Sequence, residues 1–389
     1  MGVTSFETSI ALGLIRAEPR CETIAKSDDR LSMDQQRFRT ERLEPAFAVS
    51  RKQAGGVNRR TILLATLAFP LVRTPAAKAD FHSRTAWLSG VNLSGGEFNP
   101  SRSRISFDYT YPTEADIDYF VARGLRTLRI PVLSDRLFRS NGSGELTETS
   151  DWTIVTKLIS HAEKVGAFVI IDPHQYGRMS SGLIGRDGEA TKAFVTFWGE
   201  VARRLKRQDN VIFGLMNEPN QQSATEWLTA TNAAIAAIRS AGTRQLILAP
   251  GAYWSGAHSW TSTDNASVMA GVHDPGKNFA FEVHQYLDSN NSGTSPEVVK
   301  GAGAKRLVAF TEWAHAKGFR GFLGEFGFAA TPEAEAEGRA LLAYIAHNRD
   351  VWMGWTYWAA GPWMADYMFS VQPKGGADRS QMRVLQDYK

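Results

Sequence analysis

The sequence predicts a (β/α)8 barrel, because short apolar segments alternate with longer segments of helical periodicity from Trp87 onward. Glycine follows four of the helical segments, where its left-handed conformation ends a helix readily. The competing fold, a doubly wound open sheet, requires a glycine-rich turn of the pattern G-x-G-x-x-G after an early strand. The sequence contains no such turn, so the barrel is favoured. The four glycines are Gly124, Gly166, Gly242 and Gly318.

Eight segments are predicted to be strands because each is a short apolar run bounded by polar or turn residues. In chain order they are Leu88–Leu93, Arg126–Ile130, Phe168–Asp172, Val211–Met216, Gln245–Ala249, Phe279–His284, Gly321–Gly324 and Val351–Trp358. Six longer segments are predicted to be helices, and the first, fourth and sixth carry clear apolar stripes at i, i+3 and i+4. They are Glu114–Arg123, Asp151–Val165, Ala190–Lys206, Ser223–Ala241, Ala304–Ala316 and Pro332–Asn348. Since no repeat or linker follows residue 80, we expect residues 80–389 to form a single domain.

The basic character of the chain lies in its first 79 residues. They contain 13 Lys/Arg and 8 Asp/Glu, so the rest holds 31 of the 44 basic and 32 of the 40 acidic side chains. The body of the chain is therefore nearly neutral, and a nucleic-acid partner is not expected. The one cysteine, Cys21, lies in the first part as well, which leaves the body without a disulfide or a cysteine metal site. No apolar run reaches the roughly 18–20 residues that span a bilayer.

Residues 1–56 are polar and aperiodic, and we expect them to be disordered. Two adjacent arginines then precede the apolar stretch Ile62–Val72, and Ala77-Lys78-Ala79 fits an A-x-A cleavage site. This layout predicts a secretory signal peptide over residues 57–79, of the twin-arginine type, and hence a secreted or periplasmic protein. The alternative is a short amphipathic helix that precedes the domain. Because a signal peptide normally begins a chain, we also hypothesise that translation starts near Val57 and that residues 1–56 are a mis-assigned start.

The stretch VIFGLMNEPN, residues 211–220, places a carboxylate where an apolar strand ends. A buried acid at such a position is unfavourable unless a partner or a reaction uses it. Pro219 is expected to hold Glu218 in an extended conformation, with its carboxylate at the tip of the strand. Taken alone, the motif is as compatible with an exposed Glu in a turn as with a functional acid.

Polar or aromatic side chains end seven of the eight predicted strands. In a barrel these ends meet at one mouth, so the residues are expected to lie together. Each has an ordinary structural explanation by itself, for example a hydrogen-bonded histidine or a core tryptophan, but their joint occurrence indicates an active site. They include Asn92, Arg129, His174, Asn217, Glu218, His284, Tyr286, Glu325 and Trp358.

Two glutamates at separate strand ends are the pair that cleavage of a glycosidic bond requires, one as proton donor and one as nucleophile or base. The other polar groups at the mouth can give two like acids different pKa values. Tryptophans stack on the apolar faces of sugar rings, and the loops carry Trp254, Trp260, Trp358 and Trp363. The sequence has no H-E-x-x-H, no G-x-S-x-G and no cluster at metal-ligand spacing, so no metal or cofactor is expected.

Over residues 86–372 the chain resembles the endoglucanases (cellulases) of glycoside hydrolase family 5. The segments that carry the resemblance are GVNLSGGEF (90–98), LRIP (128–131), DPHQY (172–176), FGLMNEPN (213–220), GAHSW (256–260), FEVHQYLDSNNSGT (281–294), FLGEFG (322–327) and GWTYWAAGPW (354–363). The resemblance implies a (β/α)8 catalytic domain over residues 80–389 and hydrolysis of a β-glucan polysaccharide or oligosaccharide. We expect the protein to act as a monomer.

The resemblance also implies roles for single residues. Glu218 would be the acid/base and Glu325 the nucleophile, in a retaining reaction with the carboxyl groups about 5–5.5 Å apart. Arg129 would orient the nucleophile and keep it ionised, whereas the charge of Glu325 would raise the pKa of Glu218. Asn217 would contact the 2-hydroxyl of the reacting sugar. The remaining polar members would be His174, His284 and Tyr286, with Trp358 as the stacking surface and Asn92, Trp254, Trp260 and Trp363 as further substrate contacts.

The chain departs from the family pattern at three places. Gln175 stands where Asn is usual, and the longer amide is expected to shift a hydrogen bond near the cleavage site. Residues 296–299 lack the cysteine that relatives often carry, and Tyr357 replaces Trp. Because none of these touches the two carboxylates, they bear on substrate preference. A β-mannanase or another β-1,4-glycan hydrolase therefore stays open as an alternative, as does a carbohydrate-binding barrel without catalysis.

Overall fold

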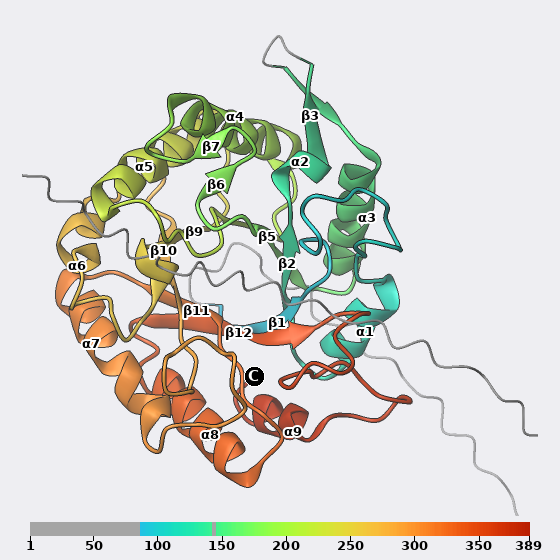
Figure 1. Cartoon of the computed structure of the whole chain (residues 1–389), viewed down its shortest axis with the longest axis vertical. Coiled ribbons are helices and arrows are strands. Elements are labelled where there is room, and N and C mark those ends of the chain that lie inside the picture. The colour runs from blue at the N-terminus through green and yellow to red at the C-terminus, as the bar shows by residue number, and fades with distance from the viewer. Residues whose placement is uncertain (1–85, 142–144) are drawn as a thin grey trace, which may run out of the picture. The chain divides into compact units, whose positions relative to one another are not determined.

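A computed structural model describes residues 86–141 and 145–389 of the chain. The predictions for residues 1–56 and 57–79 lie outside the described residues. Eight parallel strands close into a barrel in the order β1-β12-β11-β10-β9-β8-β5-β2, and helices surround it (Figure 1). The predicted (β/α)8 barrel is therefore confirmed. The barrel strands are β1 Leu88–Leu93, β2 Thr127–Val132, β5 Phe168–Pro173, β8 Val211–Gly214, β9 Ile247–Pro250, β10 Phe279–His284, β11 Gly321–Glu325 and β12 Trp352–Ala360.

The six predicted helices are all present, and every predicted helix or strand boundary lies within two residues of the observed one. Two of the helices, α1 and α5, begin with capping boxes in which a Ser or Thr and an acid three residues later satisfy free backbone donors. The four glycines predicted to end helices all have positive φ, between 69° and 87°. The helices are α1 Glu114–Ala122, α3 Ser150–Lys164, α4 Gly188–Leu205, α5 Ala224–Ser240, α7 Ala302–Lys317 and α8 Pro332–His347.

Short elements in the loops were not predicted from the sequence. Two small antiparallel hairpins lie in the loops after β2 and β5, and short helices follow β2, β9 and β12. They are β3 Phe138–Ser140 with β4 Leu146–Glu148, β6 Arg178–Met179 with β7 Gly182–Leu183, and the helices α2 Ser134–Leu137, α6 Asn265–Val268 and α9 Ser380–Gln386, besides the 3-10 turns η1 Tyr253–Ser255 and η2 Met269–Gly271.

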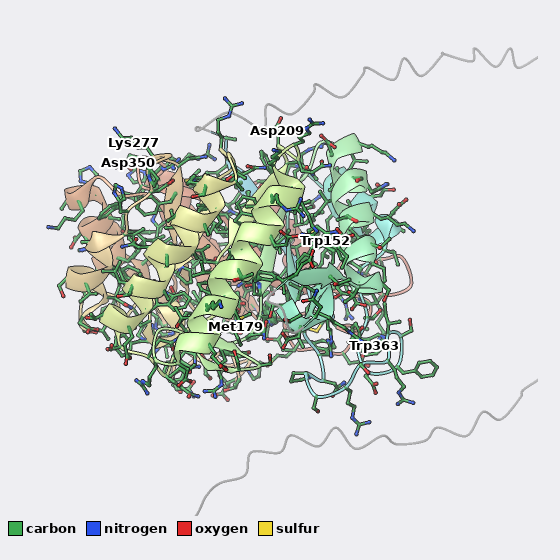
Figure 2. All side chains as sticks on the ribbon, turned by 90° about the horizontal axis from the view of Figure 1, so that it is seen from above. Trp152, Met179, Asp209, Lys277, Asp350 and Trp363 are labelled. Atoms are coloured by element: carbon green, nitrogen blue, oxygen red, sulfur yellow. The ribbon has the colours of Figure 1, made fainter. Side chains whose placement is uncertain are left out.

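The barrel has two chemically different ends. Figure 2 places Asp209, Lys277 and Asp350, which precede barrel strands, at one end, and Met179 and Trp363, which follow barrel strands, at the other. At the N-terminal end of the strands a separate apolar cluster fills the barrel. Because side chains alternate along a strand, the next inward-facing positions lie one layer closer to the mouth. The cluster consists of Leu88, Ile170, Ile212, Leu246, Leu248, Ala280 and Phe322.

The layer nearer the mouth is charged instead of apolar. Arg129 of β2, Asp172 of β5 and Glu282 of β10 are buried there, each no more than 1 % exposed. Interior layers of such barrels are usually made of bulky branched side chains, so three buried charges indicate that this layer serves the site above it.

A hollow of about 390 Å³ at the opposite end of the barrel is lined by strand-start and loop residues and contains none of the predicted site residues. Within the part of the chain that the structure describes, no helix is long and apolar enough to cross a membrane.

Candidate active site

Glu325 is the last residue of β11 and lies almost completely buried at the mouth, with 5 % of its side chain exposed. Each of its oxygens has its own donor. Arg129 donates from Nη1 to Oε1 at 2.8 Å, and the hydroxyl of Tyr286 donates to Oε2 at 2.9 Å. Since Arg129 comes from β2 and Tyr286 from the loop after β10, two distant parts of the chain fix the orientation of this carboxylate.

Glu218 lies in the loop after β8, and its side chain is 15 % exposed. The prediction of an extended conformation before Pro219 is wrong, because Glu218 has φ 42°, in the left-handed region. The predicted strand through Met216 also ends earlier, at Gly214, although backbone hydrogen bonds still tie Leu215 and Asn217 to the neighbouring strands. A non-glycine residue in this region is held there by its surroundings and is frequently part of a functional site.

His284, at the end of β10, lies between the two glutamates. Its Nδ1 is 2.8 Å from Oε1 of Glu218 and 3.7 Å from Oε2 of Glu325. Oxygens of Glu218 and Glu325 and a ring nitrogen of His284 all lie within 4.8 Å of one another, a grouping that could in principle hold a cation. The carboxylates raise the pKa of His284 to about 10, and a protonated ring offers no lone pair to a metal.

The charges at the mouth favour an ionised Glu325 and a protonated His284. Burial would raise the pKa of Glu325, but the positive charges of His284, Arg129 and His174 and the hydroxyl of Tyr286 lower it below the ordinary 4.5. Burial would lower the pKa of His284, yet Glu325 and hydrogen bonds with Glu218 and Glu282 outweigh it and raise this pKa from 6.5 to about 10. The site therefore holds a carboxylate, Glu325, that stays ionised beside an imidazolium, His284, that keeps its proton.

Arg129 connects the site to the layer beneath it. Besides Glu325, it donates from Nη2 to Oδ1 of Asn217 at 3.0 Å and lies 3.1 Å from Oδ2 of Asp172. Nδ2 of Asn217 has no hydrogen-bond partner among the described residues although it is buried. A donor left free at the mouth fits the predicted contact with a sugar hydroxyl.

Asn92 does not occupy the predicted position. It is completely buried, its Nδ2 donates to the carbonyl of Gly324 at 3.0 Å, and its Oδ1 accepts from Arg129 at 2.9 Å. Because both ends of the amide are in use below the mouth, the prediction that Asn92 contacts substrate is wrong. It supports Arg129 and ties β1 to β11.

His174 and Trp358 form one wall of the mouth. The two rings are stacked, with centroids 5.3 Å apart and planes at 19°, and Nδ1 of His174 is 2.8 Å from Oδ2 of Asp172. Burial would lower the pKa of His174, but Asp172 raises it above its ordinary value. The departure at Gln175 has a local explanation, since its Oε1 accepts from the backbone of Ser134 at 2.7 Å. This amide is therefore occupied by the loop after β2.

The three predicted tryptophans besides Trp358 divide into two groups. Trp254 and Trp363 are 54 % and 42 % exposed, and Trp363 stacks on Phe98 with centroids 6.3 Å apart. Trp260 is completely buried against Phe281, Phe310 and Trp313, so the prediction that it contacts substrate is wrong. Its ring faces the barrel's outer core instead of the mouth. Tyr357 is likewise a core residue, whose hydroxyl donates to the carbonyl of Phe328 at 2.8 Å.

Trp254 is attached to the loop that carries Glu218. Its backbone N–H donates to the carbonyl of Pro219 at 3.0 Å. It sits in the middle of three consecutive residues with positive φ, Tyr253 to Ser255, at 56°, 56° and 53°. The hydroxyl of Ser255 anchors this turn by accepting from the backbone of Gly251 at 2.8 Å. The exposed ring is therefore presented by a tightly held turn next to Glu218.

Sequence reasoning missed several polar members of the site. Glu282 lies within its strand, before the strand-end residues that the pattern selects, although a period of two places it on the same side of β10 as His284. Asp172 precedes His174 in the same way on β5. Glu97, in the loop after β1, is a further polar member. It accepts from Ser94 and from the backbone of Gly95, and burial raises its pKa despite the opposing charge of His174.

Comparison with known proteins identifies the same group of proteins by two routes. Residues 88–361 match the cellulase family, glycosyl hydrolase family 5. Endoglucanase gh5-1 of Neurospora crassa is 37 % identical over 294 residues, which cover 74 % of this chain and 73 % of that protein. The structure of XacCel5A in complex with cellopentaose is 39 % identical, covers 78 % of this chain and all of that chain, and superposes with a TM-score of 0.75. The Pseudomonas stutzeri endoglucanase Cel5A in complex with cellobiose is 31 % identical, over 77 % of this chain and 92 % of that chain, with a TM-score of 0.70.

Proposed function

The chain belongs to glycosyl hydrolase family 5, and we propose that it is a secreted, retaining endo-β-1,4-glucanase with Glu218 as acid/base and Glu325 as nucleophile. The observation that carries the proposal is the pair of carboxylates at the barrel mouth, since one oxygen of Glu218, one oxygen of Glu325 and a ring nitrogen of His284 all lie within 4.8 Å of one another. Retaining glycosidases have carboxyl groups about 5–5.5 Å apart, because one of them attacks the sugar directly. An inverting enzyme needs about 6.5–9.5 Å to admit a water between carboxylate and sugar.

In the first step, an oxygen of the ionised Glu325 attacks the anomeric carbon. The bond from that carbon to the glycosidic oxygen breaks, and its electron pair goes to the leaving oxygen, which takes a proton from Glu218. Arg129 and Tyr286 hold Glu325 in place for the attack, at 2.8 and 2.9 Å. The product of this step is a covalent glycosyl ester on Glu325.

In the second step, Glu218 acts as a base. Its carboxylate takes a proton from a water molecule whose oxygen attacks the anomeric carbon, and the ester bond breaks with its electron pair returning to Glu325. The net configuration is retained after two inversions. Asn217 contributes its unpartnered Nδ2 to the 2-hydroxyl of the reacting sugar, a contact that strengthens in the transition state.

The aromatic side chains at the mouth support a β-linked glucan as substrate. Trp254 is fixed next to the loop that carries Glu218, and Trp363, in the loop after β12, stacks on Phe98, so exposed aromatic rings lie on two of the loops that follow barrel strands. Glucosyl residues joined by β-1,4 bonds present flat apolar faces to such rings. The relatives carry the names endoglucanase and endo-β-1,4-glucanase, and the bound ligands of two similar structures are cellopentaose and cellobiose.

Secretion rests on residues 57–79. Their two arginines, apolar stretch and A-x-A site are the parts of an export signal. Mass spectrometry of the protein recovered from the culture medium or periplasm tests this part of the proposal. We expect an N-terminus near Asp80. Peptides from residues 1–56 in that product would contradict both the cleavage and the start near Val57.

A substrate panel tests the activity. Carboxymethylcellulose and barley β-glucan are expected to release reducing sugar fastest, with galactomannan and xylan slower, and proton NMR of the first product is expected to show the β-anomer. Activity confined to galactomannan would make the protein a mannanase. The Glu325→Gln variant is the control: it should lose about 10⁴-fold or more in kcat while still binding oligosaccharide. Hydrolysis at the wild-type rate by that variant would refute the assignment of the nucleophile.

A further inference from the structure

Glu282 is a buried carboxylate that the reaction described above does not use. It lies in β10, two residues before His284, and is 1 % exposed. Side chains two residues apart in a strand point to the same face, so Glu282 lies directly beneath His284 in the barrel.

Glu282 contacts both residues that hold the catalytic carboxylates. Its Oε1 lies 3.0 Å from Nε of Arg129 and 3.5 Å from Nε2 of His284. Arg129 in turn holds Glu325, and the other ring nitrogen of His284 contacts Glu218. Glu282 is therefore one residue away from each catalytic carboxylate.

Gly324 of β11 leaves room for this side chain, because a Cβ at that position would lie 2.1 Å from Oε1 of Glu282. Stability alone would favour bulky apolar side chains in this layer, because a buried ion pair contributes less than good apolar packing. Oε2 of Glu282 also has no hydrogen-bond partner among the described residues. The carboxylate at this position thus requires a reason other than packing.

We propose that Glu282 is a positioning residue of the active site: its negative charge keeps His284 doubly protonated, so that His284 donates from Nδ1 to Glu218 and remains a positive neighbour of Glu325. The inference rests on the proposed function, since it assigns a role beneath the same pair of carboxylates. A neutral His284 would present either a donor or a lone pair to Glu218, and the orientation of the acid/base would no longer be fixed.

The charged groups around His284 favour the doubly protonated ring that this role requires. Three carboxylates lie within hydrogen-bonding or ion-pair distance of its ring and favour the charged form, which is the reason for the raised pKa of His284. Arg129, His174 and the hydroxyl of Tyr286 also act on Glu325 and favour its ionised form. The negative charge of Glu325 beside His284 is therefore partly balanced by these groups. Glu282 contacts Nε2 of His284, on the opposite side of the ring from the Nδ1 that contacts Glu218. The three carboxylates are Glu218, Glu282 and Glu325.

NMR titration of the histidine side chains tests the proposal without any substrate. The chain contains eight histidines, and a His284→Asn variant identifies the resonance of His284. In the wild-type protein we expect His284 to stay protonated through pH 8. In Glu282→Gln, which keeps the shape and removes the charge, we expect its titration to move down by about 1–3 pH units. Glu282→Asp keeps the charge and should restore most of this shift.

The kinetic consequence is expected in kcat. For Glu282→Gln we expect a loss of about 10- to 100-fold in kcat, with little change in KM, and an alkaline limb of the pH profile that moves in the same direction as the NMR titration. Asp274→Asn is the matched control, because Asp274 is another buried carboxylate paired with an arginine, Arg239, at 2.8 Å. It should lower stability and leave both readouts unchanged.

Two results would overturn the proposal. One is a wild-type His284 that titrates near 6.5, a measurement that needs no variant to fold. The other is a Glu282→Gln protein that loses activity while the titration of His284 stays in place, which would reduce Glu282 to a purely structural group. Either result leaves the assignment of Glu218 and Glu325 intact, whereas a wild-type protein that cleaves no β-glycan would refute the proposed function and leave the titration result standing.

Discussion

The hydroxyl of Tyr286 donates to Oε2 of Glu325 at 2.9 Å, on a residue whose other oxygen is held by Arg129. The two carboxylate oxygens are thus not equivalent, since Oε1 accepts from a permanently charged guanidinium, whereas Oε2 accepts from a neutral hydroxyl and has the ring nitrogen of His284 at 3.7 Å. Both partners favour the ionised form, but only the hydroxyl can be removed without leaving an unpaired buried charge. Tyr286 is therefore the residue whose substitution changes the pKa of Glu325, the proposed nucleophile, most directly.

The Tyr286→Phe variant is expected to shift the acid limb of the kcat/KM profile to higher pH. The hydroxyl is one of the groups that lower the pKa of Glu325 below 4.5, so its loss moves that pKa upward. The nucleophile must be ionised, so activity then falls off at a higher pH than in the wild type. Measurement of kcat/KM between pH 3 and 7 tests this, and an unchanged acid limb would show that Tyr286 does not act on Glu325.

The Glu218→Ala variant should lose its activity selectively. With cellulose-like substrates we expect a loss of about 10²- to 10⁴-fold, because the leaving oxygen no longer receives a proton. With an aryl β-cellobioside whose leaving group is a dinitrophenolate, the first step needs no proton and should remain fast. A burst of dinitrophenolate followed by slow turnover is the expected time course. Equal losses on both substrates would argue against Glu218 as the acid/base.

The Arg129→Lys variant is expected to be far from conservative. A lysine keeps the charge but cannot serve Glu325, Asn217 and Asp172 from one planar group. We expect kcat to fall about 100-fold and the free energy of unfolding to drop by about 3 kcal/mol. Arg239→Lys is the control, since Arg239 is a buried arginine remote from the mouth. It should lose stability in urea unfolding and keep its kcat.

Replacement of Trp254 by alanine should affect substrate binding, whereas replacement of Trp260 by alanine should affect stability. Trp254 is 54 % exposed, so its loss is expected to raise KM for long oligosaccharides about tenfold, or about 1.4 kcal/mol of binding, with unfolding unchanged. Trp260 is fully buried among aromatic rings, and its loss is expected to cost about 3–5 kcal/mol of stability with a normal KM for the folded fraction. Urea titrations and kinetics on cellopentaose distinguish the two.

The fold could be predicted because each barrel strand is a short apolar run, and seven of the eight predicted strands end in a polar or aromatic residue. The strand Phe279–His284 illustrates this, since its bounds are the same in the prediction and in the structure. The hairpins β3–β4 and β6–β7 could not be predicted, because strands of two or three residues show no periodicity. Their pairing depends on loop geometry that only the folded chain defines.

The site was predicted in outline, and its errors have physical causes. Asn92 and Trp260 belong to the right segments, but sequence does not tell whether a strand-end amide or a loop tryptophan points to the mouth or into the core. Glu218 adopts φ 42° because tertiary contacts override the local preference before a proline. Glu282 could have been found by continuing the period of two inward from His284.

The hydrogen bond from Trp254 to the carbonyl of Pro219 has a consequence for altering this enzyme. The loop that carries Glu218, the proposed proton donor, is thus held to the loop that carries the ring of Trp254, although the two loops follow different strands, β8 and β9. We expect a library that randomises one of these loops alone to displace both Glu218 and the ring of Trp254. Substrate preference is therefore expected to change productively only when both loops are varied together and the turn Tyr253–Ser255, with its three left-handed residues, is kept.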